Sequence, residues 1–403
     1  MKNMELLDAI GKIDDKLILD AINDTALINR KKRRAWFRWT AIAASAVLMV
    51  FALRVFPKNP SGDKLPELPM LEIAENTNEG MGFEGYMVHD IKELVNANPW
   101  SEDAEPSTLP VWKNPLSYDD NFYVSGVNLE AMKELLLETA SRLGMDTSAL
   151  EVTILPDSEE LADIEEKTGA EIPEGSFYPT TSVAAGKDGI EIEVSTDMTA
   201  TIKYEPRIVL PEGCNFSDDA SYEELSAVAG YLKKKYHNLP GMENARTNIH
   251  GGDYDIYDQQ RHGIGFYNAE GSMIEQITSY NFNQVEFYCD ENGELYMIRI
   301  SRPDLSKKLG DYPIISVKEA KRLLLDGKYM TAVPYEMPGK KYVAKAELVY
   351  RARSLEKYYI PYYRFYVELP EEERENGLKT YGTYYVPAVR EEYFESSKSN
   401  WKF

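Results

Sequence analysis

The sequence predicts an α+β protein in which a single N-terminal transmembrane helix is followed by an extracytoplasmic region of mostly antiparallel sheets packed with helices. Three observations predict this fold class. A long apolar run follows a dense basic cluster near the N-terminus. Farther along, apolar residues at helical spacing begin after residues that cap helices. Segments with alternating polar and apolar residues follow these helices, as in the strands of a half-buried antiparallel sheet.

Residues 1–35 are predicted to form a cytoplasmic amphipathic helical tail. Apolar residues recur in this segment at helical spacing, namely Leu6, Ile10, Ile13, Leu17 and Ala21. The pattern fits one helix or two short helices hinged at Gly11. A helix of this length cannot bury its apolar face by itself, so we expect residues 5–22 to bind a cytoplasmic protein partner. A second copy of the tail, the inner membrane surface and an inert tail are the alternatives.

Residues 36–56 are predicted to form the transmembrane helix. The uncharged run from Trp39 to Leu53 would span about 22 Å as a helix, which is less than the roughly 30 Å of bilayer hydrocarbon. Flanking apolar residues lengthen the run, and arginines at both ends can reach the headgroups. The residues expected to anchor the helix at the membrane surfaces are Trp36, Phe37, Arg38, Trp39, Leu53 and Arg54. A buried soluble helix and a cleaved signal peptide are the alternatives, disfavoured by the basic flank and the long preceding segment.

Charge divides at the predicted membrane helix. Residues 1–38 contain nine Lys and Arg against six Asp and Glu, whereas the rest of the chain carries a formal net charge of −25. Because Lys and Arg stay preferentially on the cytoplasmic side, we expect a cell-membrane protein with a cytoplasmic N-terminus and an extracytoplasmic C-terminal region. The acidic region should not bind nucleic acid. Hydrophobic residues make up 43% of the whole chain, and this fraction argues against a disordered protein.

The chain beyond the membrane helix divides into three predicted parts. Residues 57–79 begin with four prolines in thirteen residues and are predicted to be an extended linker. Residues 80–303 are predicted to form an α+β domain, and residues 304–403 a C-terminal helix-on-sheet module. In that module Pro361 and Pro387 cannot donate to a sheet, so their strands should lie at edges or restart after a break.

Local signals predict several elements within these parts. A helical apolar face should begin at Asn128 and end at Gly144. The dipeptide Asn292-Gly293 predicts a hairpin with a tight primed turn, because both residue types tolerate positive φ angles. Two further helices should begin at capping boxes, formed by Ser221 with Glu224 and by Ser316 with Glu319.

The search for catalytic and cofactor motifs yields few candidates, and no cofactor is predicted. Gly80, Gly82 and Gly85 have the spacing of a dinucleotide-binding loop, but no strand leads into them. The densest polar cluster, whose residue types suit a hard metal ion or zinc, contains His250, Asp253, Asp255, Asp258 and His262. The spacing within this cluster misses both the calcium-loop and the helical His patterns. We therefore favour a polar turn that leads into a strand.

Two cysteines, Cys214 and Cys289, leave open whether a disulfide forms. Cys289 shares its strand parity with Val285 and Phe287. A buried side chain at Cys289 is therefore favoured over a bond to Cys214.

A tyrosine-rich segment is the candidate ligand surface. Aromatic rings stack on sugars or hold extended peptides at sheet edges. The candidate residues are Tyr358, Tyr359, Tyr362 and Tyr363. The alternative, which we favour, is that tyrosine fits half-buried strands, with its ring in the core and its hydroxyl in water.

Two regions carry a resemblance to known protein families. The tail LLDAIGKIDDKLILDA, followed by RKKRRAWFRW, resembles the cytoplasmic segment of uncharacterised single-pass, anti-sigma-factor-like membrane proteins of low-GC Gram-positive bacteria. The stretches ISVKEAKRLLL, YYIPYYRFYVEL and YGTYYVPAV are similar to the exterior domains of tethered regulators of a cell-wall histidine kinase. This resemblance implies a regulatory role. Residues 1–38 lack the His and paired Cys of zinc-binding anti-sigma domains, so it does not imply zinc-dependent sequestration of a sigma factor.

These features predict a membrane-anchored extracytoplasmic regulatory or sensor protein, anti-sigma-like or acting on a two-component kinase, and non-catalytic. The exterior region would meet a ligand or partner, and the membrane helix would couple it to the cytoplasmic tail. A passive surface-binding module is one alternative. The other is a tethered wall hydrolase that uses paired carboxylates.

Overall fold

The computed structural model describes most of the chain beyond residue 67. The described residues are 68–73, 86–89, 91, 94–118, 123–169, 172–217, 220–239, 241–254, 260–351, 356–372 and 377–395. The predicted tail, the predicted membrane helix and the glycines of GMGFEG lie outside them, as do Asp255 and Asp258. Within the described ranges no helix is long and apolar enough to cross a membrane.

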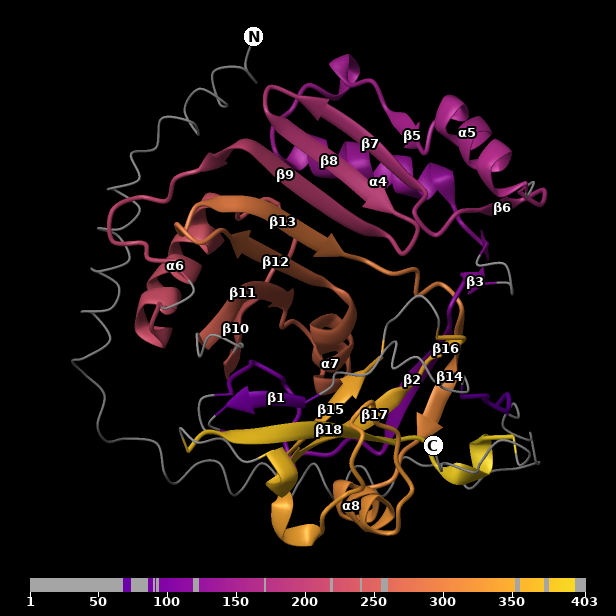
Figure 1. The fold of residues 1–403 in the computed structure, drawn as a ribbon, viewed down its shortest axis with the longest axis vertical. Helices are drawn as coiled ribbons and strands as arrows, with labels where there is room; N and C mark the ends of the chain where they lie inside the picture. The colour runs from indigo at the N-terminus through magenta and orange to yellow at the C-terminus, as the bar shows by residue number, and fades with distance from the viewer. Residues whose placement is uncertain are drawn as a thin grey trace, which may run out of the picture. The chain divides into compact units, whose positions relative to one another are not determined.

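Twelve strands of the described region form one antiparallel sheet (Figure 1). In spatial order they are β15 (Val343–Tyr350), β17 (Pro361–Glu368), β18 (Lys379–Pro387), β1 (Tyr86–His89), β10 (Ala245–Tyr254), β11 (Gln260–Asn268), β12 (Gln284–Cys289), β13 (Leu295–Ser301), β9 (Thr199–Ile208), β8 (Ile190–Ser195), β7 (Ser182–Lys187) and β5 (Thr153–Leu155). Every neighbouring pair is antiparallel. The predicted α+β class with mostly antiparallel sheets is confirmed for this region.

Helices pack on this sheet in groups. They are α4 (Leu129–Arg142), α6 (Tyr222–Lys235), α7 (Met273–Phe282) and α8 (Val317–Leu325). A further helix, α5 (Ser158–Thr168), lies between β5 and β6 in the chain. α4 packs on β7 to β9, α6 on β10 and β11, and α8 on β18. α7 contacts β11, β12 and β15. The groups join where β9 pairs with β13 and where β1 pairs with both β18 and β10. The sheet therefore runs continuously across the predicted division at residue 303.

Smaller elements link the N-terminal and C-terminal parts of the described chain. One small sheet contains β14 (Lys308–Pro313), β2 (Thr108–Lys113) and β16 (Tyr358–Tyr359), in that order. Another contains β3 (Ser117–Tyr118), β4 (Val124–Ser125) and β6 (Ser176–Phe177). Short 3-10 turns cover Thr147–Ala149, Lys340–Tyr342, Pro370–Glu372 and Glu391–Tyr393. Because β2 lies between β14 and β16, a segment assigned to the first domain by sequence is part of the C-terminal module's framework.

The chain around residue 71 also packs on the C-terminal part of the protein. Leu71 is fully buried. Its backbone N–H donates to the carbonyl of Tyr393 at 2.8 Å, and its carbonyl accepts from the N–H of Glu395 at 3.1 Å. Residues 69–73, which the sequence analysis placed in the linker, are therefore held by the folded region.

Two of the predicted helix starts are confirmed in atomic detail. The side chain of Asn128 accepts a hydrogen bond from the N–H of Ala131 at the start of α4. Gly144, just past the end of that helix, has φ +80°, the left-handed conformation that favours glycine. Ser221 and Glu224 form the reciprocal capping box of α6.

The second predicted capping box, that of Ser316 and Glu319, forms only in part. The hydroxyl of Ser316 accepts from the N–H of Glu319 at 3.2 Å, which begins α8. The carboxylate of Glu319 instead binds Arg322 one turn later, at 2.6 Å. A nearby cation has therefore replaced the backbone as the partner of this carboxylate.

The predicted hairpin is confirmed, but its turn differs from the prediction. β12 and β13 are joined by residues 290–294, and the N–H of Asp290 donates to the carbonyl of Glu294 at 3.0 Å. Only Gly293 of the Asn292-Gly293 pair has a positive φ, +76°. The carboxylate of Asp290 accepts from the N–H groups of Asn292 and Glu294, both at 2.9 Å. These bonds stabilise a longer loop that contains one left-handed residue, and they favour it relative to the predicted two-residue primed turn.

Candidate functional site

The central strands of the sheet have one apolar and one polar face. Across neighbouring strands Glu286 lies opposite Arg299, Arg299 opposite Thr201, and Thr201 opposite Glu193. The residues on the alternate positions are buried under helices and include Ile192, Ala200, Ile202, Ile264, Val285 and Ile298. This alternation has period two, as expected for strands with one face on a core. Two pockets adjoin the polar face, and Gln284 lines both of them.

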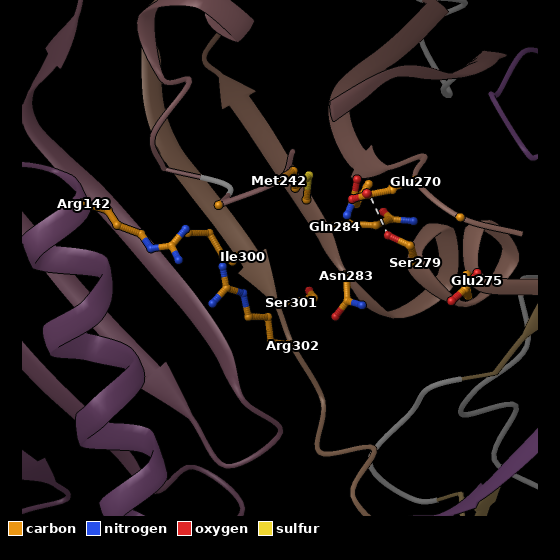
Figure 2. Close-up of a pocket in the computed structure, with 13 residues that line it drawn as sticks. Arg142, Met242, Glu270, Glu275, Ser279, Asn283, Gln284, Ile300, Ser301 and Arg302 are labelled. Carbon is orange, nitrogen blue, oxygen red and sulfur yellow. Dashed lines mark hydrogen bonds between the residues drawn. The ribbon is translucent and has the colours of Figure 1, made fainter. Parts of the chain in front are cut away.

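The larger pocket has a volume of about 550 Å³, within the range of small-molecule sites. We call it the arginine pocket, and Figure 2 shows its residues. Its polar side chains come from the end of α4, the end of β13 and the region around α7. The lining residues are Arg142, Gly241, Met242, Asn268, Glu270, Gly271, Glu275, Ser279, Asn283, Gln284, Ile300, Ser301 and Arg302.

Two arginines share one carboxylate on one side of the arginine pocket. Arg142 binds Glu138 at 2.5 Å, and Nη1 of Arg302 lies 3.3 Å from both carboxylate oxygens of Glu138. The Nη1 of Arg142 also donates to the carbonyl of Leu239 at 3.3 Å. The three charged side chains therefore carry two positive charges against one negative charge. Both arginine side chains are about 70% buried, at 28% and 29% exposure, which strengthens their interaction with an anion.

Gly241 makes room for the guanidinium of Arg142. A Cβ atom at position 241 would lie 1.8 Å from Nη1 of Arg142. The backbone of Gly241 also has φ +60°, which side-chain-bearing residues rarely adopt. The position of the arginine thus depends on a residue about one hundred positions away in the chain.

The opposite side of the arginine pocket is acidic. Glu270 is exposed, and Figure 2 shows it across the pocket from Arg142 and Arg302. Glu275 accepts a hydrogen bond from the N–H of Ser272 at 2.6 Å in the capping box of α7. These hydrogen bonds to Ser272, with the backbone bond the larger cause, lower the pKa of Glu275, so its carboxylate stays ionised at neutral pH.

Neutral polar groups lie between the two charged sides. The hydroxyl of Ser279 accepts from the N–H of Asn268 at 3.0 Å (dashed line in Figure 2). Asn283 caps the C-terminal end of α7, and the side-chain amide of Gln284 donates to the carbonyl of Tyr280. The contact with Tyr280 holds the amide of Gln284, and the amides of both Asn283 and Gln284 can donate or accept hydrogen bonds at the pocket.

The smaller pocket, which we call the histidine pocket, has a volume of about 280 Å³. It is lined by Leu94, Val95, Asn96, Asn248, His250, Gly251, Asp253, Tyr280, Gln284, Glu286, Arg364 and Tyr366. Nε2 of His250 on β10 lies 3.5 Å from the carboxylate of Glu286 on β12, and β11 lies between these two strands. The intervening strand carries Gly263, where a Cβ would lie 2.5 Å from Cε1 of the imidazole. Glycine at that position therefore allows His250 to reach Glu286.

A buried carboxylate, Glu347, holds the wall of the histidine pocket together. Its side chain is 4% exposed and lies 2.6 Å from Arg364 and 2.8 Å from Lys345. The amide of Asn96 donates to it at 2.6 Å, and the hydroxyl of Tyr366 lies 3.3 Å away. Burial raises the pKa of Glu347, but Arg364 and Lys345 outweigh burial and lower it to about 2. Glu347 is therefore an ionised structural anion and does not resemble the general acid of a hydrolase, whose pKa is raised.

Glu347 makes the stability of the protein depend on acidic pH. Its pKa is lowered in the folded state to about 2 from an ordinary value of 4.5. As the pH falls through this window, the unfolded chain binds a proton more readily than the folded chain, so the free energy of unfolding decreases. Urea unfolding at a series of pH values between 2 and about 7 should show a steeper loss for the native protein than for Glu347→Gln. Equal pH profiles would contradict this assignment.

Most of the candidate tyrosine surface lies in the core. Tyr362 and Tyr363 are fully buried and Tyr359 is 4% exposed, whereas Tyr358 is partly exposed. The hydroxyl of Tyr363 donates to the carbonyl of Ile315 at 2.8 Å. Of the four residues predicted as a ligand surface, only Tyr358 is accessible to a ligand in this structure. The reason is that other aromatic rings cover them. Tyr363 packs against Trp100 and Tyr362 against Tyr385, and Tyr359 of β16 packs against Phe282.

Only the position of Pro361 agrees with one of the two predicted arrangements. Pro361 is the first residue of β17, after a break that separates it from β16. Pro387 is the last residue of β18, where it lies opposite Tyr362. These prolines therefore stand at strand ends, where a missing N–H costs little.

The described members of the His and Asp cluster lie on a hairpin. His250 and Asp253 are on β10, and His262 lies on β11 opposite Gly251. Among the described residues, no group of three or more His, Cys, Asp or Glu side chains is arranged to hold a metal ion.

The thiol of Cys289 donates to the carbonyl of Phe216 and is partly exposed at a bulge in β12. The predicted full burial of Cys289 is therefore not found, because the bulge breaks the strand parity on which it relied.

Sequence reasoning did not find the two arginines of the larger pocket. Arg142 is the last residue of a helix that was predicted correctly, and Arg302 directly follows β13. In the local sequence each arginine looks like an ordinary surface residue. Their pairing across 160 positions depends on β13 and β9 lying side by side, with α4 packed on β9.

No protein-family model matches this chain, and no curated protein is significantly similar to it.

Proposed function

We propose that this chain is a membrane-anchored extracytoplasmic regulatory or sensor protein. Residues 36–56 would form its membrane helix, residues 1–35 would contact a cytoplasmic protein, and the described region would bind a ligand in the arginine pocket. The basic cluster before an apolar run supports the anchor and its orientation. The two partly buried arginines support a binding role for the pocket.

The observation that carries the proposal is the position of residues 94–98, which follow β1 in the chain. The amide of Asn96 binds Glu347 on β15 at 2.6 Å. The N–H of Ala97 donates to the side chain of Asn248 on β10 at 2.9 Å. The amide of Asn98 donates to the carbonyl of Leu348 at 3.1 Å. We call residues 94–98 the clasp, because they bind two distant strands of the sheet.

The clasp lies beside the proposed ligand site in the described structure. Leu94, Val95 and Asn96 line the histidine pocket, which shares Gln284 with the arginine pocket. The hydroxyl of Tyr267 donates to the carbonyl of Ala97 at 2.9 Å, and its ring packs edge-on against Tyr280 of α7. A ligand that shifts α7 can therefore alter the clasp. In a single-pass protein such a change would reach the cytoplasm as altered assembly, tilt or proteolysis of the anchor.

Protease treatment of intact cells tests the topology. The full chain carries one tag at each terminus, and the two tags are followed separately after protease is added outside. We expect the C-terminal tag to be lost and the N-terminal tag to be retained. A C-terminal tag that is protected in intact cells but lost after lysis would overturn the proposal.

Capture of partners by the tail distinguishes regulation from passive binding. A peptide of residues 1–35 should recover a sigma factor, a kinase or the tail itself from a cytoplasmic extract. The matched control replaces Leu6, Ile10 and Leu17 with aspartate, which removes the apolar face and keeps the length. If neither peptide captures a protein and deletion of the tail leaves the cellular phenotype unchanged, the protein is a passive surface-binding module.

A further inference from the structure

We propose that the arginine pocket binds a short zwitterionic peptide, with its C-terminal carboxylate at Arg142 and Arg302 and its ammonium group near Glu270. This assignment deepens the proposed function, because it assumes that the pocket is the ligand site. Three features of the pocket lead to it: a cationic side, an acidic side, and neutral amides between them.

The cationic side suits a carboxylate. Arg142 and Arg302 both contact the carboxylate of Glu138, so the three side chains carry two positive charges and one negative charge. Guanidinium groups bind carboxylates through paired, charge-assisted hydrogen bonds. The bonds from Arg302 to Glu138 are long, at 3.3 Å each. A ligand carboxylate can therefore compete with Glu138 for this guanidinium.

The acidic side suits an ammonium group. Glu270 and Glu275 are both negatively charged and lie across the pocket from the arginines (Figure 2). Glu275 is already committed to the capping box of α7, whereas Glu270 is exposed in the loop before that helix. An ammonium group is a compact cation with three donors, which an exposed carboxylate can accept. Glu270 is therefore the expected partner of the peptide N-terminus.

The same arrangement disfavours polyanionic ligands. The pocket contains two arginines but three nearby carboxylates, those of Glu138, Glu270 and Glu275. A nucleotide or a phosphorylated sugar would place further negative charge against the acidic side. The amides of Asn283 and Gln284 between the two sides match the alternating donors and acceptors of a peptide backbone.

Calorimetric titration of the full-length protein in detergent with trialanine tests this assignment. Trialanine has both terminal charges and no charged side chain. N-acetyl-trialanine lacks the ammonium group, and trialanine amide lacks the carboxylate. We expect trialanine to bind, and each blocked peptide to bind at least about ten-fold more weakly because one charge-assisted interaction is lost.

Substitutions assign each charge to one side of the pocket. Arg302→Gln should remove the preference for trialanine over its amide and keep the preference over the acetylated peptide. Glu270→Gln should remove the preference for trialanine over the acetylated peptide and keep the preference for trialanine over its amide. Gly241→Ala should resemble Arg302→Gln, because its Cβ displaces the guanidinium of Arg142 without removing a charge. Glu134→Gln, an exposed residue one turn before Glu138 on α4, is the matched control and should change neither preference.

Two outcomes would overturn the assignment. One is equal affinity for trialanine and both blocked peptides, and the other is no binding of trialanine by protein with a native circular dichroism spectrum. If Arg302→Gln does not fold, the exposed Glu270→Gln still tests the ammonium side by itself. Failure here leaves the protease and tail experiments unaffected, so the topology and the regulatory role would be judged separately.

Discussion

Replacement of Glu347 by alanine is expected to lower the free energy of unfolding by about 3–5 kcal/mol. The substitution leaves Arg364, whose side chain is 17% exposed, without its closest counter-charge. It also removes the acceptor of Asn96, so one end of the clasp is released. Urea unfolding followed by tryptophan fluorescence measures the loss, because Trp100 lies two residues after the clasp.

A second substitution separates the effect of charge from that of packing. Arg364→Met in the Glu347→Ala background should recover part of the lost stability, since it removes the uncompensated buried charge. Glu368→Ala is the matched control. Its partner Lys379 is 55% exposed, and loss of such a surface pair should cost about 1 kcal/mol or less. If Glu347→Ala costs no more than Glu368→Ala, the buried cluster does not stabilise the sheet.

Phe282→Ala is expected to destabilise the protein by about 3–5 kcal/mol. Phe282 is 1% exposed at the end of α7. Its ring centroid lies 5.3 Å from that of Trp112, 5.0 Å from that of Tyr350 and 5.4 Å from that of Tyr359. Truncation would leave a cavity among three large rings on separate strands, which cannot close around it without moving those strands. Thermal and urea unfolding of the purified full-length protein measure this loss.

An exposed apolar residue provides the control for Phe282. Leu325 is 43% exposed on α8, and Leu325→Ala should change the free energy of unfolding by no more than about 0.5 kcal/mol. If Phe282→Ala were as mild as Leu325→Ala, the end of α7 would not be part of the core. In that case the proposed transmission from the pocket to the clasp through α7 would lose its physical basis.

Local structure was largely predictable from the sequence. The side chain of Asn128 caps its helix through a contact within three residues, and the alternation in β8 and β9 reflects the two faces of one strand. The turn at Asp290 shows the limit of such reasoning. A side-chain acceptor two to four residues away selected a longer loop than the Asn292-Gly293 pair alone indicates.

The candidate site was not predictable in the same way. The tyrosines around residue 360 were the candidate ligand surface, although the sequence favoured a structural role for them in half-buried strands. Three of the four are buried, because the tertiary fold packs Tyr359 and Tyr363 into a core that contains Trp100 and Phe282 and packs Tyr362 against Tyr385. Arg142 and Arg302 carried no such signal, since a single arginine at the end of a helix or strand is common. Their shared contact with Glu138 appears only when α4 and β13 are brought together.

The sequence by itself determined the α+β class, the starts of α4, α6 and α8, and the hairpin of β12 and β13. It also determined the acidic character of the region beyond residue 38 and predicted a membrane anchor at residues 36–56. These properties follow from residues that are close in the chain. The tertiary structure alone decided that β1 lies between β18 and β10, that the clasp binds Glu347, and that two arginines share one pocket. Each of these contacts joins residues more than one hundred and fifty positions apart, and backbone pairing between distant strands leaves no local pattern from which it can be predicted.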